Sequence, residues 1–172
     1  GFNDFVVRLN HRELLAGLLR ASGIPLAQQG DALVAIDKLD KTGRDGVHAE
    51  LVARGIASDA ASTCLRLFAA GPSEMRGLLN GDERGLYAIE QLQTIRELSK
   101  ESTAARIRID PGLARGLSYY TGAIMEISVP DLSGSLGGGG RYDNLIGMFL
   151  GRDIPACGFS LGLERIIVVM TE

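Results

Sequence analysis

The chain opens with a strand-like pattern that passes directly into a helical one. Phe5–Leu9 is short, rich in β-branched residues and bounded by polar residues, which is typical of a strand. Asn10 and Glu13 resemble a capping box, so we expect a helix from here to Gly23. His11 falls in its first turn, where a surface or capping role is expected rather than catalysis. The apolar face of this helix consists of leucines at helical spacing, Leu14, Leu15, Leu18 and Leu19.

A second strand-like run and a longer helical region follow. The apolar run 32–39 is interpreted as a strand, and the alternating charges of 37–41 indicate a solvated face with weak ion pairs. Residues 43–104 have helical periodicity interrupted at glycines, which predicts an all-helical insertion of three or four helices with Ser58 and Ser73 as N-caps. The last and longest helix carries an apolar stripe, Leu86, Ile89, Leu92, Ile95 and Leu98.

From residue 105 the pattern is again mostly strand-like. Alternating or β-branched segments are broken by glycine and proline and are followed by two helical runs. We expect strands at 106–110, 118–129 and 156–160, the last of them buried, and helices at 143–150 and 162–171. The whole order predicts an α+β fold, with a largely antiparallel sheet, flanking helices and the insertion. The expected division is 1–42, 43–104 and 105–172.

Composition excludes several classes of protein. The chain has 172 residues and a formal net charge of -3, so it has room for a core but no basic footprint for nucleic acid. Cys64 and Cys157 lie far apart, which argues against a disulfide framework, and with His11 and His48 they form no zinc-ligand spacing, so no bound metal is expected. No signal-like or membrane-spanning run is present, which predicts a soluble, cytoplasmic protein.

The segment 115–122 concentrates groups that suit a binding site. Its sequence, Arg-Gly-Leu-Ser-Tyr-Tyr-Thr-Gly, places an arginine, two phenols and two glycines within eight residues. In an extended strand, Tyr120 and Glu126 share one face with Gly122, whereas Tyr119 lies on the other. Two alternatives stay open here: a polar pocket on the even face, or tyrosines that pack in a core with their hydroxyls at its rim.

Two glycine-containing segments follow. The run Gly137–Gly140, which leads into Arg141-Tyr-Asp, is either a flexible linker or a strand that another backbone or a ligand approaches closely. Gly158 to Arg165 is typical of a strand that turns through Gly162 into a helix. An arginine in the first helical turn suits a polyphosphate; the alternative is an ion pair of Arg165 with Glu164 or Glu126. Cys157 is expected to pack as a small hydrophobe.

Several of these motifs together resemble the histidyl-tRNA synthetase family of class II aminoacyl-tRNA synthetases. The resemblance rests on Ala-Arg-Gly-Leu-Ser-Tyr-Tyr-Thr-Gly at 114–122, Gly-Gly-Arg-Tyr-Asp at 139–143 and Gly-Phe-Ser-Leu-Gly-Leu-Glu-Arg at 158–165, the last similar to class II motif 3. Val-Arg-Leu-Asn-His-Arg at 7–12 and Ile-Asp-Lys-Leu-Asp-Lys at 36–41 also match. It covers nearly the whole chain and is weakest in 43–100.

The resemblance implies a substrate set and a role for each matched residue. In this family histidine attacks the α-phosphate of ATP, releasing pyrophosphate, and the histidyl group then passes to tRNA(His); Mg²⁺ accompanies ATP and the enzyme is a homodimer. Arg115 matches the catalytic arginine, which also contacts histidine. The remaining matches are histidine-binding Tyr119, Tyr120 and Tyr142, ATP-binding Arg165, Gly162 and Gly158, and the pocket wall Gly139, Gly140 and Glu126.

The chain also departs from the family pattern. Ser118 stands where the family commonly has aspartate, and motifs 1 and 2 and the anticodon-binding domain are not found. We therefore expect a partial catalytic domain, inactive alone. The alternative is a synthetase-like, histidine-sensing regulatory subunit of ATP phosphoribosyltransferase, and a third option is a helical interaction domain. The arginines at 115 and 165 favour the enzyme, since a sensor needs no phosphate-binding groups.

Overall fold

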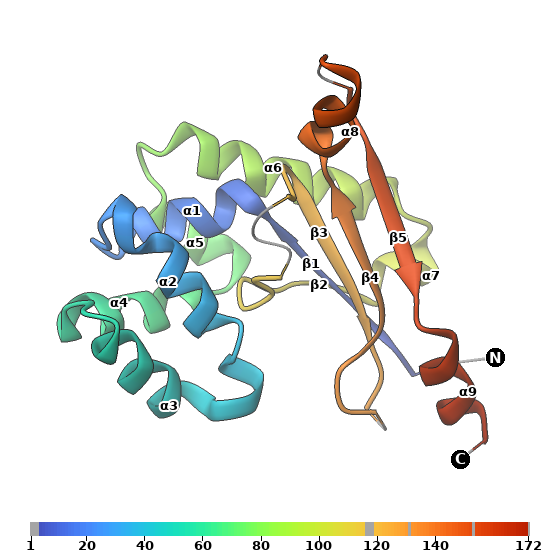
Figure 1. Cartoon of the computed structure of the whole chain (residues 1–172), viewed down its shortest axis with the longest axis horizontal. Helices are drawn as coiled ribbons and strands as arrows, with labels where there is room; N and C mark the ends of the chain where they lie inside the picture. The colour runs from blue at the N-terminus through green and yellow to red at the C-terminus, as the bar shows by residue number, and fades with distance from the viewer. Residues whose placement is uncertain (1–3, 116–118, 131, 153, 172) are drawn as a thin grey trace.

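The fold is a five-stranded sheet with most of its helices on one side and the last two helices beside the opposite edge (Figure 1). A computed structural model describes residues 4–115, 119–130, 132–152 and 154–171. The strands are β1 Val6–His11, β2 Ile107–Ile109, β3 Ala123–Ser128, β4 Ser135–Arg141 and β5 Cys157–Leu161. The helices are α1 Arg12–Ala21, α2 Leu26–Ile36, α3 Leu39–Ala53, α4 Ser58–Phe68, α5 Pro72–Leu78, α6 Glu83–Leu98, α7 Glu101–Ala104, α8 Asp143–Leu150 and α9 Leu163–Thr171.

The strand order is β2-β1-β3-β4-β5, and the sheet is mostly antiparallel. Only the β1–β2 pair is parallel; β1–β3, β3–β4 and β4–β5 are antiparallel. The expected α+β class with a largely antiparallel sheet is therefore confirmed. The helices expected within the insertion are present as α3 to α6, whereas its boundaries as a domain stay a prediction.

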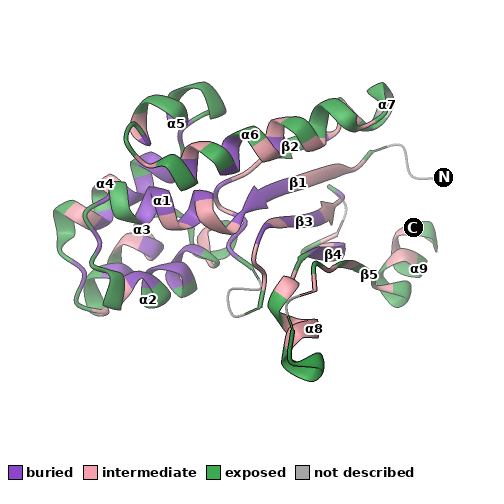
Figure 2. Cartoon of the chain, turned by 90° about the horizontal axis from the view of Figure 1, so that it is seen from above, coloured by how far each residue is buried: buried purple, intermediate pink, exposed green. Residues whose placement is uncertain are grey.

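The core lies between α1 and the helices around it and continues onto β1 (Figure 2). The four leucines of the first helix are fully buried, as their spacing predicts. The run 32–39 is not a strand: α2 covers most of it, and Ala32, Leu33 and Ile36 bury one helical face. Of the predicted stripe on α6, Leu98 is exposed, because a strict three-residue spacing drifts around a helix of 3.6 residues per turn.

The predicted N-caps were wrong, and the first helix shows why. His11 caps α1, its Nδ1 accepting a hydrogen bond from the amide of Glu13 at 3.1 Å, so its capping role is confirmed although it is buried and not on the surface. Asn10 belongs to β1, and its side-chain amide donates hydrogen bonds to the carbonyls of Pro111 and Leu113, just after the neighbouring strand β2. The helices α4 and α5 are preceded by Ala57 and Gly71, which places both predicted serine caps inside the first turn.

The C-terminal elements differ from prediction in burial more than in position. The helices at 143–150 and 163–171 and the strand at 157–161 are present. The strand β5 is an exposed sheet edge, however, and neither α8 nor α9 has a buried residue. Cys157 is exposed, so it does not pack as a buried hydrophobe. Among the described residues, no helix is both long enough and apolar enough to cross a membrane.

Candidate functional site

One row of residues crosses four strands and forms the floor of a cavity. Arg8 on β1 is directly opposite Glu126 on β3, Glu126 is opposite Gly138 on β4, and Gly138 is opposite Ser160 on β5. All four line a cavity of about 700 Å³. Gly138 contributes no side chain, so space is left beside the carboxylate of Glu126. The register of the sheet thus places charge at one end of the row and open volume in the middle.

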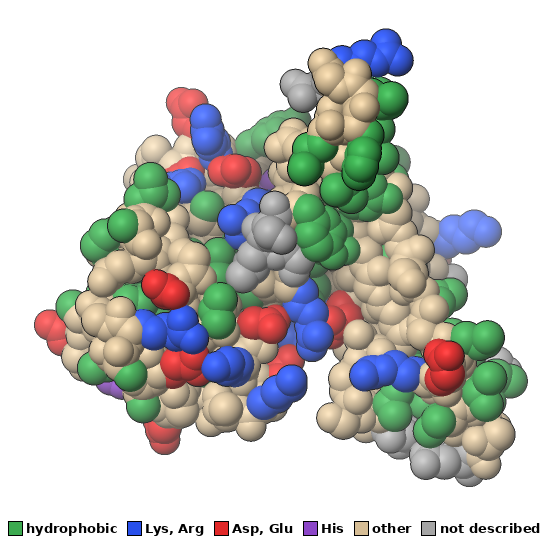
Figure 3. Space-filling view, viewed as in Figure 1, with side chains coloured by type: hydrophobic (Ala, Val, Ile, Leu, Met, Phe, Trp, Pro, Cys, Tyr) green, Lys and Arg blue, Asp and Glu red, His purple; other side chains and the backbone are tan. Residues whose placement is uncertain are grey.

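This large cavity is rich in cations although the chain is acidic. Its described lining includes four cationic and two anionic side chains, namely Arg8, Lys41, Arg115 and Arg165 with Asp40 and Glu126. Basic and acidic side chains gather at the centre of this face, between the helical part and α9 (Figure 3). A concave site with an excess of positive charge attracts anions, and phosphate groups are the anions that arginines bind best.

A smaller cavity of about 230 Å³ adjoins the large one. Arg115, Glu126, Ser135 and Gly138 line both, so the two cavities share a wall. The small cavity also contains both neighbouring tyrosines, whose ring centroids are 4.3 Å apart. Burial and the neighbouring phenol raise the pKa of Tyr120, so its hydroxyl stays protonated and can donate a hydrogen bond. The result is a polar aromatic pocket beside a cationic one.

Glu126 is the electrostatic centre of the site. Its side chain is buried, and its carboxylate makes an ion pair with Arg115 Nε at 2.7 Å and a longer one with Arg8 Nη1 at 3.6 Å. Burial raises the pKa of Glu126, and the two arginines only partly oppose this. The predicted alternative pairing of Glu126 with Arg165 is wrong, because Arg165 Nη1 instead donates to the carbonyl of Ser135 at 2.9 Å.

The two tyrosines lie on the same side and not on opposite faces. The strand β3 begins at Ala123, so the alternation used to separate the rings does not extend to residues 119 and 120. Gly116, Leu117 and Ser118 lie outside the described residues. Tyr142 is not among the residues that line either cavity; its ring centroid is 6.4 Å from that of Tyr120, and its hydroxyl lies against the position that a Cβ of Gly158 would take.

The glycine run is a strand and not a linker. It forms most of β4, paired on both sides. A Cβ on Gly140 would lie 2.5 Å from the carbonyl oxygen of Ala123 and 2.9 Å from the ring of Tyr120. A Cβ on Gly139, which lines the small cavity, would collide with β5. The close-approach interpretation is confirmed, and Gly162 lines the large cavity whereas Gly158 does not.

Sequence reasoning gave no role in the site to Arg8 and Asn10, which help to hold it together. Arg8 is anchored by Asp110 at 2.6 Å and by Asp40 at 2.7 Å. Asn10, fully buried, donates to the carbonyls of Pro111 and Leu113 at 3.1 and 2.8 Å, which fixes the backbone just before Arg115. The available signal was the polar pair at positions 8 and 10 within an apolar strand, since buried polar groups in a strand need specific partners.

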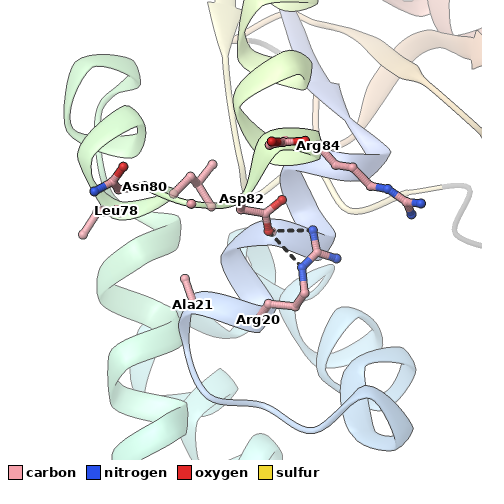
Figure 4. A pocket seen from close by; sticks show the side chains of 10 residues that line it. Arg20, Ala21, Leu78, Asn80, Asp82 and Arg84 are labelled. Carbon is pink, nitrogen blue, oxygen red and sulfur yellow. Dashed lines mark hydrogen bonds and ion pairs between the residues drawn. The ribbon is translucent and has the colours of Figure 1, made fainter.

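A separate cavity of about 710 Å³ lies between α1 and the start of α6 (Figure 4). None of the predicted site residues lines it. Its central feature is Asp82, which accepts hydrogen bonds from Arg20 Nε and Nη2 at 2.9 and 2.7 Å and caps α6 through the amide of Gly85. Asp82 thus caps α6 and joins it to α1 through Arg20, which gives it a structural role. The candidate functional site is therefore the pair of cavities around Glu126.

The comparison with protein families agrees with this geometry. A family model described as histidyl-tRNA synthetase matches residues 1–166. The chain belongs to the histidyl-tRNA synthetase family. A curated relative, the histidine–tRNA ligase of Leifsonia xyli subsp. xyli, is 42% identical in an alignment of 178 positions. The alignment covers 97% of this chain and 41% of that protein. The chain spans about two fifths of the length of this relative and of the histidine–tRNA ligase of Gloeobacter violaceus.

Solved structures of histidyl-tRNA synthetases have the same fold as this chain. The histidyl-tRNA synthetase from Nostoc sp. PCC 7120 matches with a TM-score of 0.85 at 30% identity, covering 98% of this chain and 42% of that one. An ATP phosphoribosyltransferase regulatory subunit/histidyl-tRNA synthetase from Bacillus halodurans matches with a TM-score of 0.80 at 24% identity, covering 100% and 46%. The second match supports the fold alone, because its identity is low.

Proposed function

We propose that this chain is the part of a histidine–tRNA ligase that binds histidine and ATP and contributes to formation of histidyl-adenylate. The observation that carries the proposal is the position of Arg115, which lines both the tyrosine-containing cavity and the cationic cavity. An amino acid in the small cavity and a nucleotide in the large one would meet at this guanidinium. The Leifsonia xyli relative is a histidine–tRNA ligase, which supports the same reaction class.

In this proposal the small cavity takes histidine. Phenol hydroxyls of Tyr119 and Tyr120 are suited to hydrogen-bond an imidazole, and a polar pocket of this kind rejects isosteres that leave its groups unpaired. Arg115 then contacts the carboxylate of histidine at the wall between the cavities. Tyr142 supports the ring of Tyr120 rather than contacting the substrate.

The large cavity takes the phosphates of ATP. When the carboxylate oxygen of histidine attacks the α-phosphorus, charge develops on the phosphoryl oxygens while pyrophosphate leaves. Arg115 stabilises that charge, and Arg165 holds the departing phosphates from the first turn of α9. Within the described residues no group of three or more His, Cys, Asp and Glu side chains is arranged to hold a metal ion, so Mg²⁺ is proposed to enter as part of the ATP complex.

The proposal extends to the complete protein. We expect the 172-residue chain alone to give no histidine-dependent ATP–pyrophosphate exchange, because the remaining walls of the pocket are proposed to come from the rest of a longer ligase. Transfer to tRNA(His), the homodimer and the cytoplasmic location are likewise expectations from the family. A histidine-sensing regulatory subunit is the second candidate, and it would bind histidine without catalysing exchange.

The test is exchange kinetics in the complete ligase that contains this chain. Arg115→Ala should lower kcat by about 10²- to 10³-fold, the usual cost of removing one donor that stabilises transition-state charge, with a smaller change in the KM for histidine. Arg76→Ala, an arginine on α5 outside both cavities, is the matched control and should leave kcat unchanged. Equal kinetics for the two variants would overturn the proposal, and histidine binding by a wild-type protein without exchange would favour the sensor.

A further inference from the structure

Glu126 is an unusual residue for the middle of a sheet. It lies in β3, its side chain is almost fully buried, and within the described ranges it is the only acidic residue that is buried. Removing a carboxylate from water is costly unless cations are provided at short distance. A β-strand core gains nothing from such a group, so its presence indicates that the carboxylate acts on its partners.

The two cations around Glu126 are held very differently. Arg8 is mostly buried on β1 and is fixed by Asp110 and Asp40 in addition to Glu126. Arg115 follows a loop, its side chain is 44% exposed, and its nearest carboxylate partner is Glu126, with Asp37 at 3.9 Å. Glu126 therefore lies between a fixed cation, Arg8 at 3.6 Å, and a more exposed one, Arg115 at 2.7 Å.

The atoms of the contact show how this restraint acts. The carboxylate approaches Arg115 at Nε, the guanidinium nitrogen nearest the main chain, at 2.7 Å. A guanidinium is a rigid planar fork, so a carboxylate held beside Nε attracts that side of the group and leaves the two outer nitrogens for a bidentate ligand. Arg8 supplies a second counter-charge, so Glu126 is not left as an unpaired buried ion when an anionic substrate attracts Arg115.

We propose that Glu126, buried in β3 and paired with the fixed Arg8, is a positioning residue that orients Arg115 toward the junction of the two cavities. This inference rests on the proposed function for its kinetic consequence but not for its structural one. It gives Glu126 a role beyond that of a pocket wall, and it makes Arg8, Asp40 and Asp110 a supporting network that extends from Arg115 across β1 to the end of β2.

The kinetic test compares two glutamate variants in the complete ligase. Glu126→Gln keeps the shape and removes the charge, and it should lower kcat for histidine-dependent exchange by about 10- to 100-fold, with a much smaller change in the KM values. Glu50→Gln is the matched control, because Glu50 also pairs with an arginine, Arg54, at 2.8 Å but lies outside both cavities. Unchanged kcat in Glu126→Gln, or an equal loss in Glu50→Gln, would overturn the positioning role.

A second measurement does not depend on catalysis or on the folding of a variant. In ¹H–¹⁵N spectra of the wild-type 172-residue chain, the Nε–H of Arg115 should exchange with solvent more slowly than that of Arg76, whose Nε makes no ion pair among the described contacts. Equal exchange rates would overturn the proposal. If the complete wild-type protein shows no histidine-dependent ATP–pyrophosphate exchange, the proposed function fails. The Nε–H measurement still decides whether Glu126 holds Arg115.

Discussion

The two ends of the sheet bury their apolar residues to very different extents. At the β1 end, α1 has five buried residues, and its leucines are fully enclosed by neighbouring helices. At the β5 end, α9 is more apolar in sequence than α1 but has no buried residue, and Leu163 and Met170 are 65% and 71% exposed. The difference is visible as the change from purple to green in Figure 2. An apolar helical face thus predicts burial only if a partner is present to cover it.

This difference extends to the candidate site. Arg115 pairs with a buried carboxylate on the central strand β3, whereas Arg165 is on the uncovered helix and donates to the backbone carbonyl of Ser135. The large cavity includes both residues. We therefore infer that the arginine at the shared wall is preorganised, and that the one proposed to bind the departing phosphates depends on α9 being held in place.

The largest expected effect comes from a matched pair of leucine substitutions. Leu18→Ala on α1 removes a fully buried side chain and should lower the free energy of unfolding by about 2–5 kcal/mol. Leu163→Ala on α9 removes a side chain that is already 65% exposed and should change it by less than about 0.5 kcal/mol. Urea unfolding of the 172-residue chain measures both. Similar losses in the two variants would show that α9 is packed after all.

A smaller effect is expected at the start of α6. Asp82→Ala removes the N-cap of α6 and the partner of Arg20 (Figure 4), and should cost about 1 kcal/mol. Burial alone would raise the pKa of Asp82, but the bonds from Gly85 and Arg20 outweigh it and hold this pKa below its ordinary value of 3.8.

The same substitution has a defined pH dependence. Because the folded pKa of Asp82 is the lower one, its stabilisation is fully present above the unfolded pKa and is lost as pH falls through the folded pKa. The difference in urea midpoint between wild type and Asp82→Ala should therefore shrink on going from neutral pH into the acid range. A constant difference would mean that Asp82 acts through packing and not through its charge.

The sequence predicted most elements, and the errors have identifiable causes. Periodicity located the helices of 43–98 and the C-terminal strands, and of the ten predicted site residues all but Tyr142, Gly140 and Gly158 line one of the two cavities. The run 32–39 was misassigned because a short apolar segment fits a buried strand or a buried helix equally well. Capping failed at Asn10 because its amide has partners about a hundred residues away, at Pro111 and Leu113, which no local pattern reveals.

The ion pairs of Arg8 with Asp40, Asp110 and Glu126 could not have been predicted either, because the partners are far apart in the sequence. The pairing of Arg8 with Glu126 depends on strand register, and that of Arg8 with Asp40 depends on how α3 begins beside the sheet. Tyr119 was placed on the wrong face because the start of β3 was set too early, and strand ends are the least certain part of such a prediction. Sequence motifs therefore supplied the reactive groups, while the contacts that orient them are tertiary.

The central claim is that Arg115 pairs with a buried carboxylate of a well-packed sheet, whereas Arg165 lies on a helix that is not covered. Amide hydrogen exchange of the 172-residue chain tests it most directly, because local opening is measured residue by residue. We predict that amides of α1 and β1 exchange with free energies close to that of global unfolding, whereas those of α9 exchange with values near zero. Equal protection of α1 and α9 would contradict the account.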